Sequence, residues 1–283
     1  MPKKDDRPEA LKPYLFHGLD LQWSNRDQAT SDCPFCGGEA KFHVGIKNGL
    51  WKCFTCDAGG EKGGGNSTVF LRELWAMSSD ATTDLEELSS DRLVEETTLI
   101  QWKTVRNPLN DRWMVPGYNP DGSLLQLYKY TKVKGKKRLL ATPTKNHPHC
   151  LFGYPVYRAD CDEVYLCEGP WDAMALWEQL QIKGSDSCVL GTPGANVFKD
   201  SWSQLFTGKS VNILFDNDHP KTNPKTGQTT DPAGYAGSRR VSSILTSSNH
   251  PPVSINYLQW GEGGFDRNIP DGTDVRDFLN ADF

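Results

Sequence analysis

The sequence predicts a mixed fold, with an antiparallel four-cysteine zinc ribbon near the N-terminus and a parallel α/β sheet in the C-terminal half. Three observations lead to this prediction. Two Cys-x-x-Cys pairs occur with sixteen residues between them. An apolar run before Glu168 and Gly169 is followed by apolar residues at helical spacing, which is typical of a strand, a turn and a helix. A second apolar run ends in two acids, Asp216 and Asp218.

The two cysteine pairs, Cys33 with Cys36 and Cys53 with Cys56, match the pattern of a four-thiolate zinc site. The segment between them predicts strands on either side of a turn at Asn48-Gly49. Four protein ligands close the tetrahedron, so we expect one structural Zn²⁺. The alternative is a set of reduced, metal-free thiols. His43 is the competing ligand, but a packing or DNA-contacting role is more usual for a histidine in this position.

The segment after the second cysteine pair contains five glycines between residues 59 and 65, and we expect it to form a turn with neither strand nor helix. Ser67 is predicted to cap a helix that carries Val69, Phe70 and Leu74. Residues 80–96 then hold seven acids and one arginine. We therefore expect a zinc-ribbon domain over residues 1–78 and an acidic linker over residues 79–98, with the domain boundary inside it.

Positive charge is concentrated in the next part of the chain, the predicted basic subdomain of residues 99–160. Residues 101–158 hold eleven Lys and Arg against two Asp, whereas the whole chain has a net charge of −5. Predicted strands at 113–118 and 124–130 form a hairpin in which Tyr128 and Tyr130 either stack on bases or fill the core. The candidate ligands for template or triphosphate phosphates are Arg112, Lys129, Lys132, Lys134, Lys136, Lys137 and Arg138.

The first acidic motif of the C-terminal region, residues 161–283, begins with a predicted strand over Val164–Cys167. Glu168 ends this strand, Gly169 permits a tight turn and Pro170 can take the first helical position. Asp172 then lies in the first turn of an amphipathic helix. The motif thus delivers two acids near the carboxyl end of one strand.

The second acidic motif follows a predicted strand over Val211–Phe215, and the carboxyl ends of neighbouring parallel strands are where ligands bind. Clustered carboxylates are costly without a cation, and Mg²⁺ is the usual one. Residues 219–231, rich in Pro, Lys, Thr and Gly, are predicted to be a loop that leads to a helix capped by Asp231. After a last strand at 253–257, Asp274 is the candidate for a further metal-linked acid, with Asp271 as its rival and helix capping as the alternative for both.

Glu168 with the Asp216-x-Asp218 pair resembles the TOPRIM domain, which primases, topoisomerases and some nucleases share. The order of zinc ribbon, acidic linker, basic region and TOPRIM domain resembles bacterial-type DNA primases, and most closely the primase half of phage primase–helicases. The resemblance implies synthesis of short RNA primers on single-stranded DNA from ribonucleoside triphosphates. It also implies that Glu168, Asp216 and Asp218 hold Mg²⁺, with two ions in the usual mechanism and with Asp172 and Asp274 as further catalytic acids. Glu168 is alternatively the general base.

This resemblance favours a self-standing phage or prophage primase that works with a separate replicative helicase in the bacterial host cytoplasm. A TOPRIM nuclease and a non-catalytic, zinc-bearing recombination mediator are the alternatives. The sequence shows neither a signal peptide nor a membrane span, so we expect a cytoplasmic protein without a membrane partner. Its other cysteines lack knuckle spacing and are expected to be buried thiols: Cys150, Cys161, Cys167 and Cys188.

Overall fold

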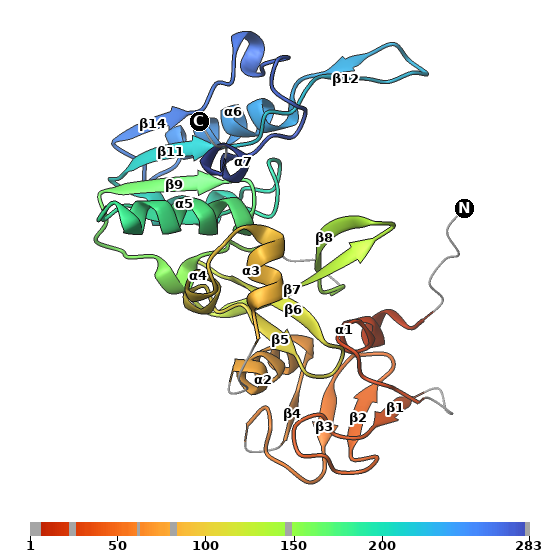
Figure 1. Cartoon of the computed structure of the whole chain (residues 1–283). Coiled ribbons are helices and arrows are strands. Elements are labelled where there is room, and N and C mark those ends of the chain that lie inside the picture. The colour runs from red at the N-terminus through yellow and green to blue at the C-terminus, as the bar shows by residue number, and fades with distance from the viewer. Residues whose placement is uncertain (1–6, 23–26, 61–62, 80–83, 145–148, 281–283) are drawn as a thin grey trace. The chain divides into compact units, whose positions relative to one another are not determined.

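The computed structural model describes residues 7–22, 27–60, 63–79, 84–144 and 149–280. The chain divides into two compact units (Figure 1). Unit 1 comprises residues 1–84, 103–116 and 124–148, and unit 2 comprises residues 85–102, 117–123 and 149–283. Both units mix helices with strands, which confirms the predicted fold class. No helix in the described ranges combines the length and the apolar character that crossing a membrane requires.

Unit 1 begins with a zinc-ribbon-like sheet in which four antiparallel strands follow one another in sequence order. The strands are β1 (Gln28–Ser31), β2 (Phe42–Gly45), β3 (Trp51–Cys53) and β4 (Gly64–Gly65). They are flanked by a 3-10 helix (Glu9–Leu11), α1 (Lys12–Phe16) and α2 (Ser67–Ser79). The predicted turn at Asn48-Gly49 is confirmed, because β2 and β3 pair across it.

Aromatic side chains from these elements fill the core of the ribbon part. The rings of Phe42 and Trp51 stack with centroids 5.0 Å apart, and the rings of Tyr14 and Phe70 lie 4.8 Å apart. The hydroxyl of Tyr14 donates a hydrogen bond of 2.6 Å to the carbonyl oxygen of Gly49, which fixes α1 against the β2–β3 turn. Such ring pairs add about 0.5–1.5 kcal/mol each beyond the burial of their area.

The glycine-rich segment differs from the prediction, because Gly64 and Gly65 form strand β4 on the edge of β3. A Cβ on Gly64 would lie 2.4 Å from the carbonyl oxygen of Trp51, so glycine lets the two backbones approach closely. The helix cap also differs. The side chain of Asn66, not Ser67, accepts the hydrogen bond from the backbone N–H of Val69 at 3.1 Å.

A second antiparallel sheet of unit 1 has the order β5-β6-β7-β8. Its strands are β5 (Val105–Asn107), β6 (Arg112–Tyr118), β7 (Leu124–Val133) and β8 (Lys136–Ala141). The two predicted strands of the hairpin correspond to β6 and β7, whereas β5 and β8 add an edge on each side. Lys134 and Gly135 close the β7–β8 turn with φ values of 51° and 76°.

Unit 2 is built on a parallel sheet with the order β10-β9-β11-β14. Its strands are β9 (Glu163–Cys167), β10 (Cys188–Gly191), β11 (Ser210–Leu214) and β14 (Ser254–Tyr257). Val164 and Leu166 of β9 and Val211 and Ile213 of β11 are fully buried, and they pack in one cluster with Phe198, Trp202, Phe206 and Val241. The two paired strands confirm the predicted strands before Glu168 and Asp216.

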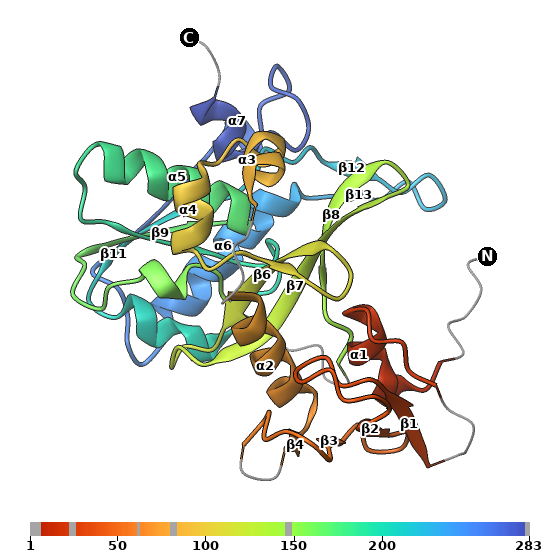
Figure 2. The same cartoon turned by 60° about the horizontal axis from the view of Figure 1, so that its bottom comes forward.

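The remaining elements of unit 2 connect or cover this sheet (Figure 2). The helices are α3 (Glu86–Arg92), α4 (Glu96–Gln101), α5 (Pro170–Ile182), α6 (Ala233–Thr246) and α7 (Val275–Leu279). Three 3-10 helices span Tyr154–Val156, Asp200–Phe206 and Glu262–Gly264, and a small hairpin pairs β12 (Lys221–Thr222) with β13 (Thr229–Thr230).

Two short helices, α3 and α4, occupy much of the acidic segment that we expected to be a linker. The carboxylate of Glu178 on α5 accepts hydrogen bonds of 2.9 Å from the backbone N–H of Glu95 and from the hydroxyl of Thr98. Arg92 lies over the ring of Trp171 at 5.1 Å. The acidic segment is therefore attached to α5 by side chains that its charge pattern does not reveal.

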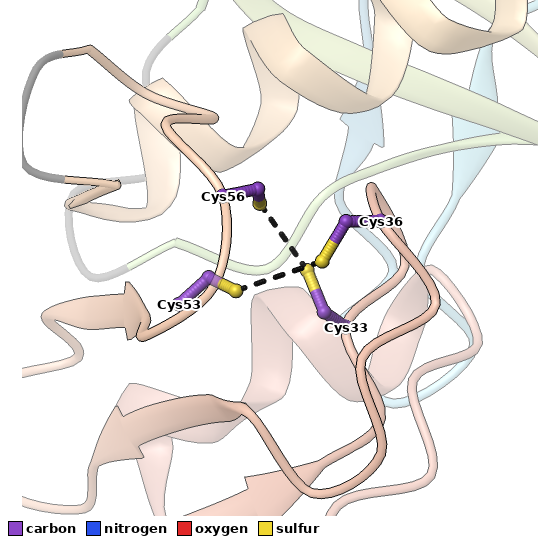
Figure 3. A group of neighbouring side chains, drawn as sticks. All are labelled: Cys33, Cys36, Cys53 and Cys56. Carbon is purple, nitrogen blue, oxygen red and sulfur yellow. Dashed lines mark hydrogen bonds between the residues drawn. The ribbon is translucent and has the colours of Figure 1, made fainter.

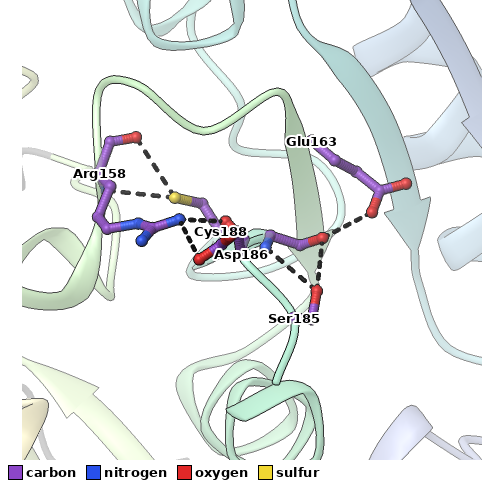
Figure 4. Close-up of polar contacts among 6 residues, drawn as sticks. Arg158, Glu163, Ser185, Asp186 and Cys188 are labelled. Atoms are coloured by element: carbon purple, nitrogen blue, oxygen red, sulfur yellow. Dashed lines mark hydrogen bonds and ion pairs between the residues drawn. The ribbon is translucent and has the colours of Figure 1, made fainter. Parts of the chain in front are cut away.

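The four cysteines outside the two pairs are all buried, as predicted. Figure 4 shows the surroundings of Cys188 at the start of β10. The backbone N–H of Arg158 donates to Sγ of Cys188 at 3.2 Å, while the guanidinium of Arg158 lies 3.1 Å from the carboxylate of Asp186. Ser187 donates a hydrogen bond of 2.7 Å to Glu163 on the neighbouring strand. These contacts tie the first residues of β9 and β10 together at the edge opposite to the acids.

Candidate functional site

The four cysteines of unit 1 converge in the structure (Figure 3). Their sulfur atoms all lie within 4.8 Å of one another, and Cys33 with Cys56 and Cys36 with Cys53 are separated by 3.8 Å each. A tetrahedron with Zn–S bonds of about 2.3 Å has edges of about 3.8 Å, so the spacing fits Zn²⁺. The first pair lies on a tight turn before β2, and the second pair begins at the end of β3.

An exposed aromatic ring lies directly beside this cluster. Phe54 follows Cys53 and exposes 62% of its surface. The ammonium of Lys52 lies 5.0 Å from the ring centroid of Phe54, and the ring of His43 packs against it edge-on at 4.8 Å. His43 thus faces Phe54 on the surface of β2 and β3 and is not part of the sulfur cluster. An exposed ring with a neighbouring cation is a suitable platform for a nucleic-acid base.

The acids of unit 2 meet at the carboxyl ends of β9 and β11. These strands are neighbours, and Cys167 pairs with Leu214 immediately before Glu168 and Asp216 leave the sheet. Gly234, at the start of α6, permits a close approach here, because a Cβ would lie 2.3 Å from the carbonyl oxygen of Asp216. The topology therefore brings the two predicted acidic motifs to one edge of the sheet.

The electrostatics show that these carboxylates interact. Burial, together with the negative charges of Glu168, Asp172, Asp274 and Asp218, raises the pKa of Asp216 to about 10. Burial and the charge of Asp218 raise the pKa of Glu168 to about 7. Because like charges disfavour ionisation, the cluster holds protons until a cation replaces them.

Among the described residues, no hydrogen-bond partner is found for a buried carboxylate oxygen of Glu168, Oε2, nor for Oδ1 of Asp172. Such oxygen atoms beside further carboxylates fit the hard ligands that Mg²⁺ prefers. The ligand atoms of the acids are not as closely spaced as the sulfur atoms. Among the described residues, the four cysteines are the only group of metal-binding side chains whose ligand atoms all lie within 4.8 Å.

Asp172 and Asp274 form a second part of the acidic cluster with Arg276. Burial and the charge of Asp274 raise the pKa of Asp172 to about 7, although Arg276 opposes the shift. The guanidinium of Arg276 lies 2.8 Å from Asp274 and 4.0 Å from Asp172. Asp274 also caps α7, since its side chain accepts from the backbone N–H of Asp277 at 2.8 Å. Asp274 therefore caps a helix, which was the alternative to a metal-linked role, and it also lies beside the other acids.

Asp271 takes a different position from its rival. Its carboxylate accepts a hydrogen bond of 2.7 Å from the backbone N–H of His219 and lies 3.9 Å from the ammonium of Lys221. Asp218 accepts from the backbone N–H of Gly234 at 2.9 Å. This bond corrects the expected cap of α6, because the helix begins at Ala233 without a side-chain bond from Asp231.

Two residues that the sequence analysis did not single out organise this cluster. Asn217, the middle residue of the Asp-x-Asp motif, is fully buried. Its side-chain amide donates to the carbonyl oxygens of Asp266, Ile269 and Pro270, and its side-chain oxygen accepts from the N–H of Asp266. Asn217 thus holds the loop that carries Asp274. Arg276 is the second such residue. In the sequence, its position two residues after Asp274 is the one feature that could have pointed to it.

The predicted phosphate ligands lie mostly at the tip of the β7–β8 hairpin in unit 1. The exposed members are Lys132, Lys134, Lys136, Lys137 and Arg138. Lys132 pairs directly with Lys137 across the two strands, and residues 122–144 contain no acid. Like charges in direct cross-strand pairs are destabilising, so their concentration here favours a binding role over a stabilising one.

Other members of the basic set are placed differently. The ammonium of Lys129 donates 2.8 Å to the carbonyl oxygen of Phe16 and lies 3.8 Å from that residue's ring centroid. Burial lowers the pKa of Lys129, with a smaller contribution from nearby Arg112, which is exposed. Tyr128 and Tyr130 are 5% and 3% exposed, so these rings fill the core. Lys129 and the two tyrosines are therefore not part of the exposed basic surface.

No protein-family model matches the sequence, and no curated protein matches it. The structure is similar to that of the DnaG catalytic core, with a TM-score of 0.49, 15% identity and coverage of 75% of this chain and 74% of the other. It is also similar to the DnaG primase catalytic domain bound to single-stranded DNA, with a TM-score of 0.47, 14% identity and coverage of 75% of this chain and 76% of the other. A third similar structure is the primase fragment of the bacteriophage T7 primase–helicase, with a TM-score of 0.42, 11% identity and coverage of 91% of this chain and 93% of the other. These structural neighbours are primases of the bacterial and phage type, which the sequence also resembles.

Proposed function

We propose that this protein is a DNA primase that joins ribonucleotides on single-stranded DNA by Mg²⁺-dependent nucleotidyl transfer. The observation that carries the proposal is the convergence of Glu168, Asp216 and Asp218 at adjacent strand ends, with the pKa values of Glu168 and Asp216 raised. An acidic cluster of this kind is suited to a two-metal centre that binds the attacking and leaving oxygens. The resemblance of these motifs to the TOPRIM domain selects nucleotides as the substrate class.

Each acid has a specific part in the proposed mechanism. Glu168, Asp216 and Asp218 would hold Mg²⁺, which when bound activates the 3′-hydroxyl and stabilises the leaving pyrophosphate. Glu168 alternatively accepts the proton of the hydroxyl, because a pKa of about 7 suits a general base at neutral pH. Arg276 acts as a positioning residue, since it holds Asp274 and faces Asp172 beside the other acids.

The template would be bound by unit 1. The exposed ring of Phe54, with Lys52 and His43 beside it, offers a stacking platform on the zinc ribbon. The tip of the β7–β8 hairpin offers five exposed cations to the phosphate backbone. In this proposal the ribbon takes part in choosing the initiation site, and a separate replicative helicase in the cytoplasm of a bacterial host is the partner.

The proposal is tested by incubating the purified protein with single-stranded DNA of mixed sequence, Mg²⁺ and labelled ribonucleoside triphosphates. We expect short labelled oligoribonucleotides, which disappear when Mg²⁺ is removed with a chelator. Shortened DNA without incorporated label would replace the proposal with a TOPRIM nuclease. DNA binding without either product would favour the recombination mediator.

The basic tip gives a separate prediction for template binding. Lys136→Gln with Lys137→Gln should weaken binding to single-stranded DNA about 25-fold at ~0.1 M salt, because each lost phosphate contact lowers the salt slope by about 0.7. Fluorescence anisotropy over a range of salt concentrations measures both quantities. The control removes two exposed cations elsewhere in unit 1, with Arg72→Gln and Lys103→Gln. Equal losses in the two double variants would show that only net charge matters.

A further inference from the structure

Residues 219–231, here called the arm, leave the sheet directly after Asp218 and return at the start of α6. Both views show the arm as a hairpin that extends away from the parallel sheet of unit 2 (Figures 1 and 2). The hairpin is paired, with Lys221 opposite Thr230 and Thr222 opposite Thr229. The backbone N–H of Asn223 donates to the carbonyl oxygen of Gln228 at 2.9 Å, which continues the pairing towards the tip.

The base of the arm is anchored beside the acidic cluster. Nε2 of His219 lies 3.1 Å and 3.0 Å from the carbonyl oxygens of Asp266 and Ile269. Because carbonyl oxygens only accept, this nitrogen carries the proton and donates to both. The backbone N–H of His219 donates to Asp271, and at the other end Gly234 donates to Asp218. The two ends of the arm are therefore fixed next to Asp218.

The composition of the arm is unusual in this acidic chain. Residues 219–230 include two lysines, several threonines and amides, and no acid. Residues 221–231 are all exposed, so the arm buries no core of its own. The side chain of Lys221 is 71% exposed and its ammonium lies 3.9 Å from the carboxylate of Asp271, which makes their ion pair weak. Among the described residues, the ammonium of Lys225 forms no ion pair. These features suit a partner with many negative charges and few apolar groups.

We propose that the arm binds the phosphate backbone of the nucleic acid whose reacting end lies at the acidic cluster, an inference that rests on the proposed function. Lys225 lies six residues after His219, which corresponds to about 20 Å of extended chain. In a duplex, the phosphates of each strand are spaced about 3.4 Å apart along the helix axis, so the arm spans about six nucleotides of a duplex strand from the cluster. Lys221, Lys225 and the threonine hydroxyls are the groups that contact phosphate.

The test compares Lys225→Gln with Lys183→Gln, a matched removal of one exposed lysine of unit 2. Lys183 ends α5, so it lies at the far end of the helix that starts beside Glu168. Binding is measured by anisotropy without ribonucleotides, on single-stranded DNA and on the same DNA annealed to a short RNA. We expect Lys225→Gln to weaken binding about fivefold at ~0.1 M salt and to lower the salt slope by about 0.7, with twice that change in slope when Lys221→Gln is added. Lys183→Gln should leave both values unchanged.

The two DNA substrates show which strand the arm contacts. Equal losses on both assign the arm to the template, and a loss confined to the annealed substrate assigns it to the template–primer product. Identical affinities and slopes for Lys225→Gln and Lys183→Gln on both substrates would overturn the inference. A protein that makes no primers but loses DNA affinity with Lys225→Gln would refute the proposed function and leave the arm as a DNA contact.

Discussion

Asp216→Asn is expected to lower primer synthesis by about a thousandfold or more while leaving the affinity for single-stranded DNA within about twofold. The substitution keeps the size of the side chain and replaces the carboxyl group at the centre of the acidic cluster with an amide that cannot ionise to bind a cation; four other carboxylates influence Asp216. The cations of the proposed template surface lie in unit 1 and are unaffected. Labelled ribonucleotide incorporation measures the first quantity, and anisotropy measures the second.

The same substitution should make the metal-free protein more stable, which separates a functional loss from misfolding. The pKa of Asp216 is raised by folding, so its protonated form favours the native state. Its contribution is fully present below the ordinary pKa near 4 and is lost as the pH rises towards about 10. At pH 8 without Mg²⁺ we therefore expect Asp216→Asn to raise Tm by a few degrees. Added Mg²⁺ should stabilise the original protein more than the variant.

Asp162→Asn provides the matched control, because Asp162 is exposed and lies just before β9, at the end of the strand opposite to Glu168. It should change neither synthesis nor the response of Tm to Mg²⁺. Undiminished primer synthesis in Asp216→Asn would refute the proposed catalytic centre. A Tm below that of the original protein, together with lost synthesis, would instead indicate a structural role for Asp216.

Cys53→Ser is expected to reduce the zinc content from one ion per chain to none and to unfold the ribbon part of unit 1. Structural Zn²⁺ supplies about 10–16 kcal/mol in isolated zinc fingers, which is comparable to the whole stability of a typical domain. Cys53 is 2% exposed and ends β3, so losing the metal also frees the strand that carries Lys52 and leads to Phe54. Elemental analysis measures the zinc, and protease digestion reports the unfolding.

Cys150→Ala is the control for zinc content, since Cys150 is a buried cysteine outside the cluster. This variant should retain one ion even if its stability changes. Binding of single-stranded DNA should fall in Cys53→Ser, because the platform around Phe54 depends on β2 and β3. A full zinc content in Cys53→Ser would show that the four sulfurs do not hold the metal.

Local patterns of residues were enough to predict the elements that carry the acids and the cysteines. The buried strands before Glu168 and Asp216 can be predicted from the sequence, because apolar runs of this length and the turn at Gly169 are local signals. The cysteine pairs are equally local, since each knuckle is one tight turn. The resemblance to primases rests on these short motifs, and the structure reproduces both the ribbon and the parallel sheet that they implied.

The side chains that support the motifs could be identified only in the folded chain. Asn217 binds carbonyl groups about fifty residues away, and Arg276 faces Asp172 from a helix a hundred residues later. In the sequence, Lys129 is one more cation of a basic run. In the structure, its ammonium donates a hydrogen bond to the carbonyl oxygen of Phe16, 113 residues earlier. Strand β4 and the bond from Gly234 to Asp218 likewise depend on close backbone approach. Hydrogen bonds and ion pairs of this kind join residues that are distant in the sequence. They therefore cannot be predicted from hydrophobic periodicity or from the spacing of residues in a motif.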